Sequence, residues 1–119
     1  MFRVIIAGGR DYNDYDTLKN KCDYYLGNVA KTKHIEIVSG VAKSADSLGV
    51  KYAEEKKYYL KLYPADWKSH GKSAGYVRNT SMAEYADALI AFWDGKSKGT
   101  QHMIETAKTH KLIVKVVRY

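Results

Sequence analysis

The sequence has one cysteine, one proline and no apolar run as long as a membrane span. The single cysteine, Cys22, cannot form an internal disulfide, and it falls on the apolar face of a predicted helix, where we expect inert packing. A span would need ~20 consecutive apolar residues, and the N-terminal stretch MFRVIIAGG is typical of a strand and not of a signal peptide. These absences predict a cytoplasmic protein without a membrane partner.

Standard motifs for metals and phosphates are missing as well. The four histidines show no metal-ligand spacing and there is no cysteine pair, so we expect neither a metal site nor a bound cofactor. Both GKS triplets, at 71–73 and 95–97, lack the upstream glycine of a Walker A loop, because Asp66 and Ile90 occupy those positions. The dinucleotide-binding motif GxGxxG and the nucleophile motif GxSxG are also missing. A Ser-His-Asp triad remains an open alternative, because its residues need not be close in sequence.

The charge is strongly positive. The chain carries 20 lysine and arginine residues against 13 aspartate and glutamate residues, which gives a net charge of +7. An anionic partner is therefore expected, and small nucleotides, phosphometabolites and nucleic acid all qualify. The lysines are spread over most segments without a dense tract, so we expect most of them on solvated helix faces.

Apolar segments with strand and helix patterns alternate from one end of the chain to the other. The expected strands are 2–7, 34–38, 59–63, 88–93 and 112–117, and the expected helices are ~14–29, ~44–57, ~75–86 and ~100–110. Short buried strands that alternate with helices indicate a parallel sheet covered on both faces. We therefore predict a single α/β domain over residues 1–119, a three-layer Rossmann-like fold with a mostly parallel sheet of about five strands.

The unusual residues of the chain come directly after the predicted strands. They form four loops, GGRD at 8–11, SGVAKSAD at 39–46, PADW at 64–67 and WDGKSKGT at 93–100. Such sheets bind ligands outside the carboxyl ends of their strands, so we expect the four loops to share one rim. Strand-to-helix turns use glycine and serine in any case, but several such loops rich in cations favour an anion or nucleotide pocket.

The predicted ligand-binding residues are the small residues of this rim and the polar and aromatic residues around them. They are Gly8, Gly9, Arg10, Ser39, Gly40, Lys43, Asp66, Trp67, Lys72, Arg78, Lys96, Gly99 and Thr100. Phosphate is expected on the N–H groups of Gly99 and Thr100, at the start of the last helix. Asp66 could accept ribose hydroxyls or act as a base, or it could cap the next segment. Trp67 could stack on a nucleobase, or it could cover the edge of the core.

Six stretches that run over nearly the whole chain resemble one family. They are VIIAGGRDY (4–12), IVSGVAKSAD (37–46), PADW (64–67), GKSAGYVRN (71–79), MAEYADALIAFWDGKSKGT (82–100) and MIE (103–105). Together they resemble the YspA-type (YpsA-related) branch of the SLOG superfamily, which is named after the DNA-processing protein DprA (Smf) and the LOG enzymes. Such genes often occur in bacteria and phages. Related domains often pair, which leaves a homodimer open.

The LOG phosphoribohydrolases are the relatives with a defined reaction, the cleavage of a nucleoside monophosphate into base and ribose 5-phosphate. Arg78 matches their arginine, and Gly99-Thr100 matches the Gly-Thr that starts their last helix. Their catalytic glutamate follows that Gly-Thr closely, at a point where this sequence has His102 and Met103. If the protein is an enzyme, its catalytic residues are expected to be Arg78, Glu105 and Asp66.

Three functions stay open at this stage. The resemblance implies a domain that binds a nucleotide or nucleotide-derived ligand as a sensor, carrier or sequestering protein. The alternative is a LOG-like hydrolase of an N-glycosidic or phosphate bond, and a second alternative is DprA-like binding of single-stranded nucleic acid, which the positive charge would assist. The missing carboxylate after Gly99-Thr100 favours binding ahead of cleavage.

Overall fold

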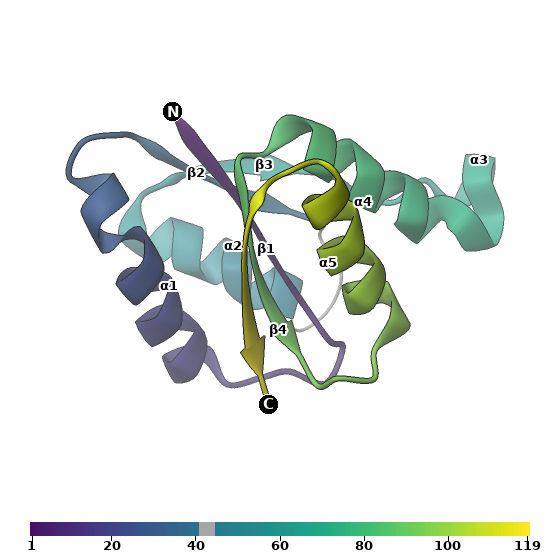
Figure 1. The fold of residues 1–119 in the computed structure, drawn as a ribbon, viewed down its shortest axis with the longest axis horizontal. Helices are drawn as coiled ribbons and strands as arrows, with labels where there is room; N and C mark the ends of the chain where they lie inside the picture. The colour runs from purple at the N-terminus through teal and green to yellow at the C-terminus, as the bar shows by residue number, and fades with distance from the viewer. Residues whose placement is uncertain (41–44) are drawn as a thin grey trace.

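Five parallel strands form the central sheet of the protein in a computed structural model that describes residues 1–40 and 45–119 (Figure 1). The strands are β1 (Phe2–Gly8), β2 (Ile35–Ser39), β3 (Tyr59–Leu62), β4 (Ala88–Trp93) and β5 (Ile113–Arg118). They lie in the order β3-β2-β1-β4-β5, and every neighbouring pair is parallel. This is the strand order of Rossmann folds, and it confirms the predicted fold class.

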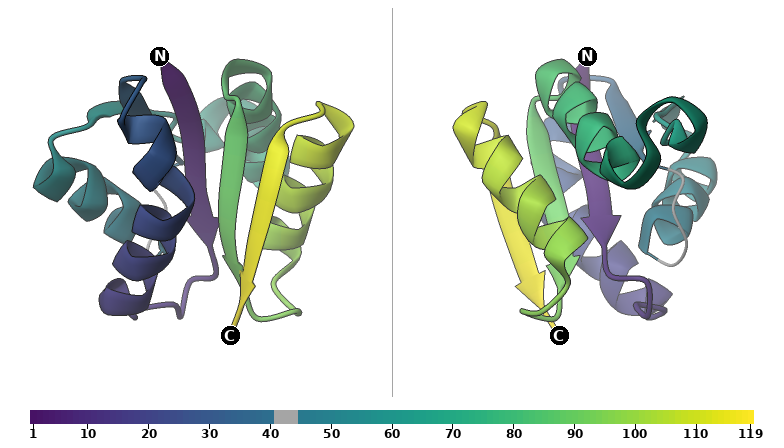
Figure 2. Two further views of the ribbon diagram at one scale, coloured as in Figure 1. Left: turned by 60° about the vertical axis from the view of Figure 1, so that its left-hand side comes forward. Right: turned by 90° about the vertical axis from the view of Figure 1, so that its right-hand side faces the viewer.

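Helices cover both faces of the sheet and complete the three layers (Figure 2). They are α1 (Tyr15–Ala30), α2 (Ala45–Lys56), α4 (Ala74–Tyr85) and α5 (Lys98–Thr109), with the short helix α3 (Trp67–His70) and the 3-10 turn η1 (Gly71–Ser73) between β3 and α4. Helices α1 and α2 pack on one face and α4 and α5 on the other. No helix in the described part of the chain combines the length and apolar character needed to cross a bilayer.

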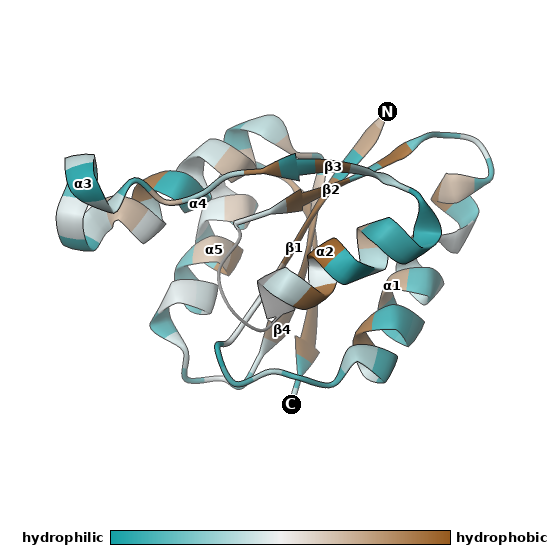
Figure 3. Ribbon diagram, turned by 180° about the vertical axis from the view of Figure 1, so that it is seen from behind, coloured by the Kyte–Doolittle hydropathy of each residue, from teal (hydrophilic) through white to brown (hydrophobic). Residues whose placement is uncertain are grey.

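Successive side chains of the central strands point to opposite faces of the sheet, so the hydrophobic core has one part on each face. In β1, Val4 and Ile6 point toward α1 and α2, whereas Ile5 and Ala7 point toward α4 and α5. Because both faces of these strands are buried, their sequences read as continuous apolar runs, and Figure 3 shows the centre of the sheet as the hydrophobic part of the ribbon. Cys22 is fully buried in the α1 side of the core, where burial raises the pKa of its thiol to about 12.

The segment after β3 differs from the prediction, which had a loop from Pro64 to the start of α4. It contains the one-turn helix α3, which begins where the Asp66 carboxylate accepts a hydrogen bond from the N–H group of Ser69 at 3.1 Å. That hydrogen bond holds the pKa of Asp66 below its usual range. A helix held by one cap shows no apolar periodicity, which explains why the sequence pattern missed it. Helix α5 also begins at Lys98, two residues before its predicted start at 100.

Candidate functional site

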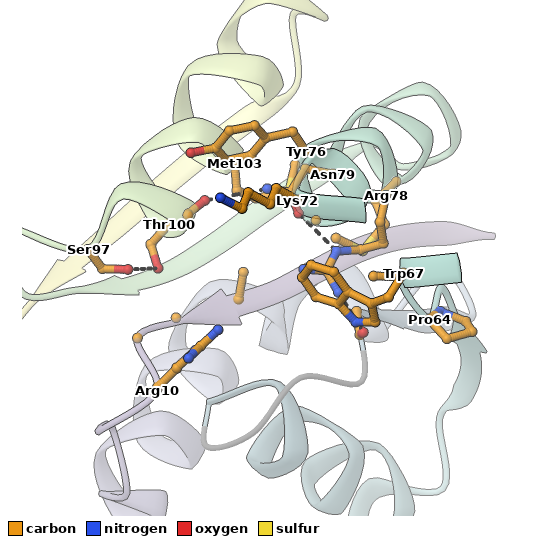
Figure 4. A pocket seen from close by; sticks show the side chains of 18 of the residues that line it. Arg10, Pro64, Trp67, Lys72, Tyr76, Arg78, Asn79, Ser97, Thr100 and Met103 are labelled. Carbon is orange, nitrogen blue, oxygen red and sulfur yellow. Dashed lines mark hydrogen bonds between the residues drawn. The ribbon is translucent and has the colours of Figure 1, made fainter. Parts of the chain in front are cut away.

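A pocket with a volume of about 890 Å³ lies outside the carboxyl ends of β1 and β4 (Figure 4). The helix after β1 covers one face of the sheet and the helix after β4 covers the other, so the chain leaves a crevice between these two neighbouring strands. A volume in the range of ~300–1,000 Å³ is typical of small-molecule sites. The position and the size of the pocket therefore both suit a ligand site.

Nine of the thirteen residues predicted to bind the ligand line this pocket. They are Gly8, Gly9, Arg10, Gly40, Trp67, Lys72, Arg78, Gly99 and Thr100. They come from the ends of β1 and β2, from the segment between β3 and α4, from α4 and from α5. The predicted residue Lys43 lies outside the described residues.

The other three predicted ligand residues and the predicted catalytic residue Glu105 do not line the pocket. Ser39 is fully buried at the end of β2, and the Asp66 carboxylate caps α3. Lys96 is exposed in the turn before α5. Glu105 is exposed on α5, where its carboxylate accepts a hydrogen bond from Gln101 at 3.1 Å, so it does not reach the pocket from this position.

The start of α5 supplies N–H groups to one side of the pocket. The N–H group of Gln101 is the first in α5 to make a helical hydrogen bond, and it donates to the carbonyl of Ser97 at 3.1 Å. The N–H groups of Lys98, Gly99 and Thr100 precede it, and the first turn of a helix leaves such groups without a partner in the helix. Together with the positive end of the helix dipole, they form a site that suits an anion.

A carboxylate shapes the turn that leads into α5. One oxygen of Asp94 accepts hydrogen bonds from the N–H groups of Lys96 and Ser97, each at 2.8 Å. These bonds, first of all the one from Ser97, hold the pKa of Asp94 below its usual range, so the group stays ionised. Asp94 therefore fixes the loop that presents Thr100 to the pocket.

Arg78 on α4 holds the opposite side of the pocket. Its Nη1 group donates to the carbonyl of Gly40 at 2.7 Å, and its Nε group donates to Asn79 Oδ1 at 3.1 Å. A Cβ atom added to Gly40 would lie 2.7 Å from Nη1, so only glycine leaves room for the guanidinium at this position. Among the described residues, no hydrogen bond is made by the Nη2 group.

Residues 2–70 match the sequence profile of the YAcAr family, the YspA, cpYpsA-related SLOG family. The chain belongs to this family. It is also 33% identical over 115 residues to the Gene 61 protein of Mycobacterium phage D29, in a match that covers 91% of this chain and 90% of that protein. The predicted resemblance to the YspA-type SLOG branch is thereby confirmed.

The SLOG pocket also contains residues that the sequence interpretation missed. Tyr76, Asn79 and Met103 line it, together with the carboxylates Asp11 and Asp94. Helical spacing was the signal that could have found Met103. Met103 lies one turn after the predicted residue Gly99 on α5, so the two share a helix face. Tyr76 and Asn79 share a face of α4 with each other, and no predicted residue marks that face.

Met103 is one of the two residues at the point where the sequence resemblance to LOG enzymes implies a glutamate, and it occupies the pocket side of α5. Its side chain is 1% exposed and lines the pocket. His102 does not line the pocket, and its ring stacks on Tyr76 with centroids 4.3 Å apart. The pocket side of α5 therefore presents a thioether at Met103, whereas a carboxylate is the group that assists cleavage of a glycosidic bond.

The two carboxylates in the pocket are already engaged. Asp94 accepts the two N–H groups of its own loop, and Asp11 accepts a hydrogen bond from the hydroxyl group of Tyr119 at 2.8 Å. The same hydroxyl group fills the space where a Cβ atom at Gly9 would stand. In the described part of the chain, no group of three or more acidic, histidine or cysteine side chains is arranged to hold a metal ion.

Proposed function

We propose that this SLOG protein binds a nucleotide or a nucleotide-derived small molecule in the pocket between β1 and β4. Membership of the SLOG family supports a nucleotide-related function. The observation that carries the proposal is the convergence of the α5 N-terminus, Arg78 and Lys72 on one pocket at the crevice of a Rossmann-type sheet. Binding without turnover suits a sensor, carrier or sequestering protein. We propose that the protein acts in the cytoplasm.

The phosphate of the ligand is assigned to the α5 side of the pocket. The N–H groups of Gly99 and Thr100 would donate to its oxygens, and the Nη2 group of Arg78 would approach from α4. Lys72 lines the same pocket and supplies a further positive charge. Hydrogen bonds between charged partners are about twice as strong as neutral ones, so this side should contribute most of the affinity.

The base of the ligand is assigned to Trp67. The indole is 60% exposed, although large aromatic side chains usually bury more of their surface, and it lines the pocket (Figure 4). Stacking of a base on an exposed aromatic ring contributes ~1–3 kcal/mol. A ligand with phosphate on α5 and base on Trp67 would span the pocket.

Binding is favoured over cleavage because Met103 lies on the pocket side of α5 and Glu105 does not. The test is incubation of the folded protein with AMP, ADP-ribose and NAD, followed by assay for ribose 5-phosphate and free base. We expect the nucleotides to remain intact while equilibrium dialysis detects their binding. Turnover that is lost in Arg78→Ala would support the hydrolase instead. Affinity for a single-stranded oligonucleotide that falls steeply with salt would support the nucleic-acid alternative.

Replacing Gly40 by alanine is expected to weaken nucleotide binding about tenfold. The new Cβ atom would lie 2.7 Å from Nη1 of Arg78 and would displace the guanidinium without changing the charge of the pocket. The obstructed atom is the end of a flexible side chain, so the protein should still fold. Isothermal titration with AMP and ADP-ribose measures the change.

The matched control is Gly27→Ala on α1, where an added Cβ atom meets nothing within 4 Å. Gly27 lies in a helix away from the pocket, and alanine favours a helix over glycine by ~1 kcal/mol, so this variant should bind normally and gain stability. Equal affinity of the two variants would show that Arg78 does not need its place beside Gly40.

A further inference from the structure

The side-chain amide of Asn79 connects the two sides of the pocket. Asn79 is 6% exposed and lies on α4 next to Arg78, whose Nε group donates to its Oδ1 atom at 3.1 Å. Its Nδ2 atom lies 3.4 Å from the carbonyl oxygen of Gly99 and 3.2 Å from Nδ1 of His102, both on α5. One buried amide therefore contacts the guanidinium on α4 and the first turns of α5 (Figure 4).

The chemistry of the partners decides which way this amide points. A guanidinium only donates hydrogen bonds and a carbonyl only accepts them, so Oδ1 must face Arg78 and Nδ2 must face Gly99. Nδ2 then donates to Nδ1 of His102, which has to be the unprotonated ring nitrogen. The ring proton lies on Nε2, which is 3.4 Å from the hydroxyl oxygen of Thr106.

The surroundings of His102 favour this neutral form. Tyr76 and Asn79 face it from α4, and Thr106 and Glu105 face it from α5. Burial lowers the pKa of His102, and the negative charge of Glu105 opposes that shift only in part. The neutral ring can therefore keep accepting the hydrogen bond from Asn79 at neutral pH.

We propose that Asn79 is a positioning residue that holds the Arg78 guanidinium and the first turn of α5 in their binding geometry, and that it does so only while His102 is neutral. This proposal rests on the proposed function, because the groups that Asn79 holds are those assigned to the phosphate. A protonated His102 would direct an N–H group at the N–H groups of Asn79. The amide would then have to move, and Arg78 would lose its Nε partner.

The pH dependence follows from the lowered pKa of His102. A histidine whose pKa is lower in the folded protein than in the unfolded chain stabilises the fold fully above its unfolded value of ~6.5. That contribution is lost as the pH falls through the folded value. Nucleotide affinity should weaken over the same acidic range, because protonation disturbs both sides of the pocket together.

The first test measures binding of ADP-ribose to wild type, Asn79→Ala and His102→Gln. This probe carries no phosphate monoester, whose own pKa of ~6 would add a second pH dependence. At pH ~7.5 we expect Asn79→Ala to bind about tenfold to a hundredfold more weakly. Glutamine at 102 can still accept from Asn79 but does not titrate, so His102→Gln should remove most of the acid weakening seen in wild type. Normal binding by a folded Asn79→Ala, or unchanged acid weakening in His102→Gln, would overturn the proposal.

The second test needs no ligand and reads the network directly. Nitrogen-15 NMR of the imidazole rings, assigned by the signal that His102→Gln removes, should show His102 as the neutral Nε2–H tautomer at pH ~7.5. Asn79→Asp places a carboxylate against Nδ1 and should raise the pKa of His102 above ~6.5. An Nδ1–H tautomer in wild type, or an unchanged pKa in Asn79→Asp, would contradict the network.

The two tests separate failure of this proposal from failure of the proposed function. If wild type binds no nucleotide while His102 shows the expected tautomer and response, the proposed function fails and the Asn79 network stands. If wild type binds ADP-ribose and Asn79→Ala binds it equally well, the positioning role fails and the proposed function stands. Should Asn79→Ala not fold, the comparison of wild type with His102→Gln decides alone.

Discussion

Arg78→Ala is expected to weaken nucleotide binding by about a hundredfold, the largest loss of affinity that one substitution in the pocket should cause. The guanidinium donates to Gly40 and Asn79, and we assign its Nη2 group to the ligand. Alanine would remove both the proposed ligand contact and these two hydrogen bonds. A hydrogen bond to a charged group contributes ~1.5–3 kcal/mol, and ~1.4 kcal/mol corresponds to a tenfold change in affinity. Isothermal titration with ADP-ribose measures the loss.

Two further variants show whether the geometry or the charge of Arg78 matters. Arg78→Lys keeps the charge but loses the planar fork, so it should bind more weakly than wild type and more tightly than Arg78→Ala. Lys21→Ala removes the same unit charge from an exposed position on α1 and should leave affinity nearly unchanged. If Arg78→Ala and Lys21→Ala lose equally little affinity, the pocket assigned here is not the binding site.

Phe92→Ala is expected to destabilise the fold by about 3–5 kcal/mol. Phe92 lies near the end of β4, is completely buried and stacks on Tyr12 with ring centroids 5.0 Å apart. A domain of this size has a total stability of ~5–15 kcal/mol, so the loss is a large fraction of it. The melting temperature should fall by more than about 10 °C, which differential scanning calorimetry or circular dichroism can measure.

Ile113→Ala is the matched control for this prediction. Ile113 lies on the edge strand β5 and its side chain is 56% exposed, so its truncation removes little buried surface and leaves no enclosed cavity. We expect a loss of less than about 1 kcal/mol. A similar loss for both variants would mean that Phe92 does not pack as the structure shows.

The sheet could be predicted because each central strand is a short run of apolar residues that can be recognised without knowing its neighbours. Val4 to Ala7 are apolar without interruption since both faces of β1 are covered, and this alone indicates a buried parallel strand. Helix α3 could not be predicted in this way, because a local cap from Ser69 to Asp66 begins it and none of its residues is buried. Apolar periodicity identifies elements that bury one face, and α3 has no buried residue.

The pocket residues that backbone topology brings together could be predicted from the sequence. The contacts that depend on how two helices pack could not. Gly8 and Gly40 had to reach one rim because the carboxyl ends of neighbouring parallel strands lie together. The contact of Asn79 with His102 depends on which faces of α4 and α5 meet, and no local pattern states this. Glu105 shows the same limit, because its helix face turns toward solvent and pairs with Gln101.

A nucleotide-derived ligand that binds in the pocket should raise the melting temperature of the purified protein. A ligand that binds only the folded state at about 100 times its dissociation constant adds ~2.7 kcal/mol to the free energy of unfolding. We predict that AMP, ADP-ribose or NAD raises the melting temperature of wild type by several degrees, and that Arg78→Ala loses this shift. No shift in wild type with any of the three, at millimolar concentration, would show that the pocket does not bind these nucleotides.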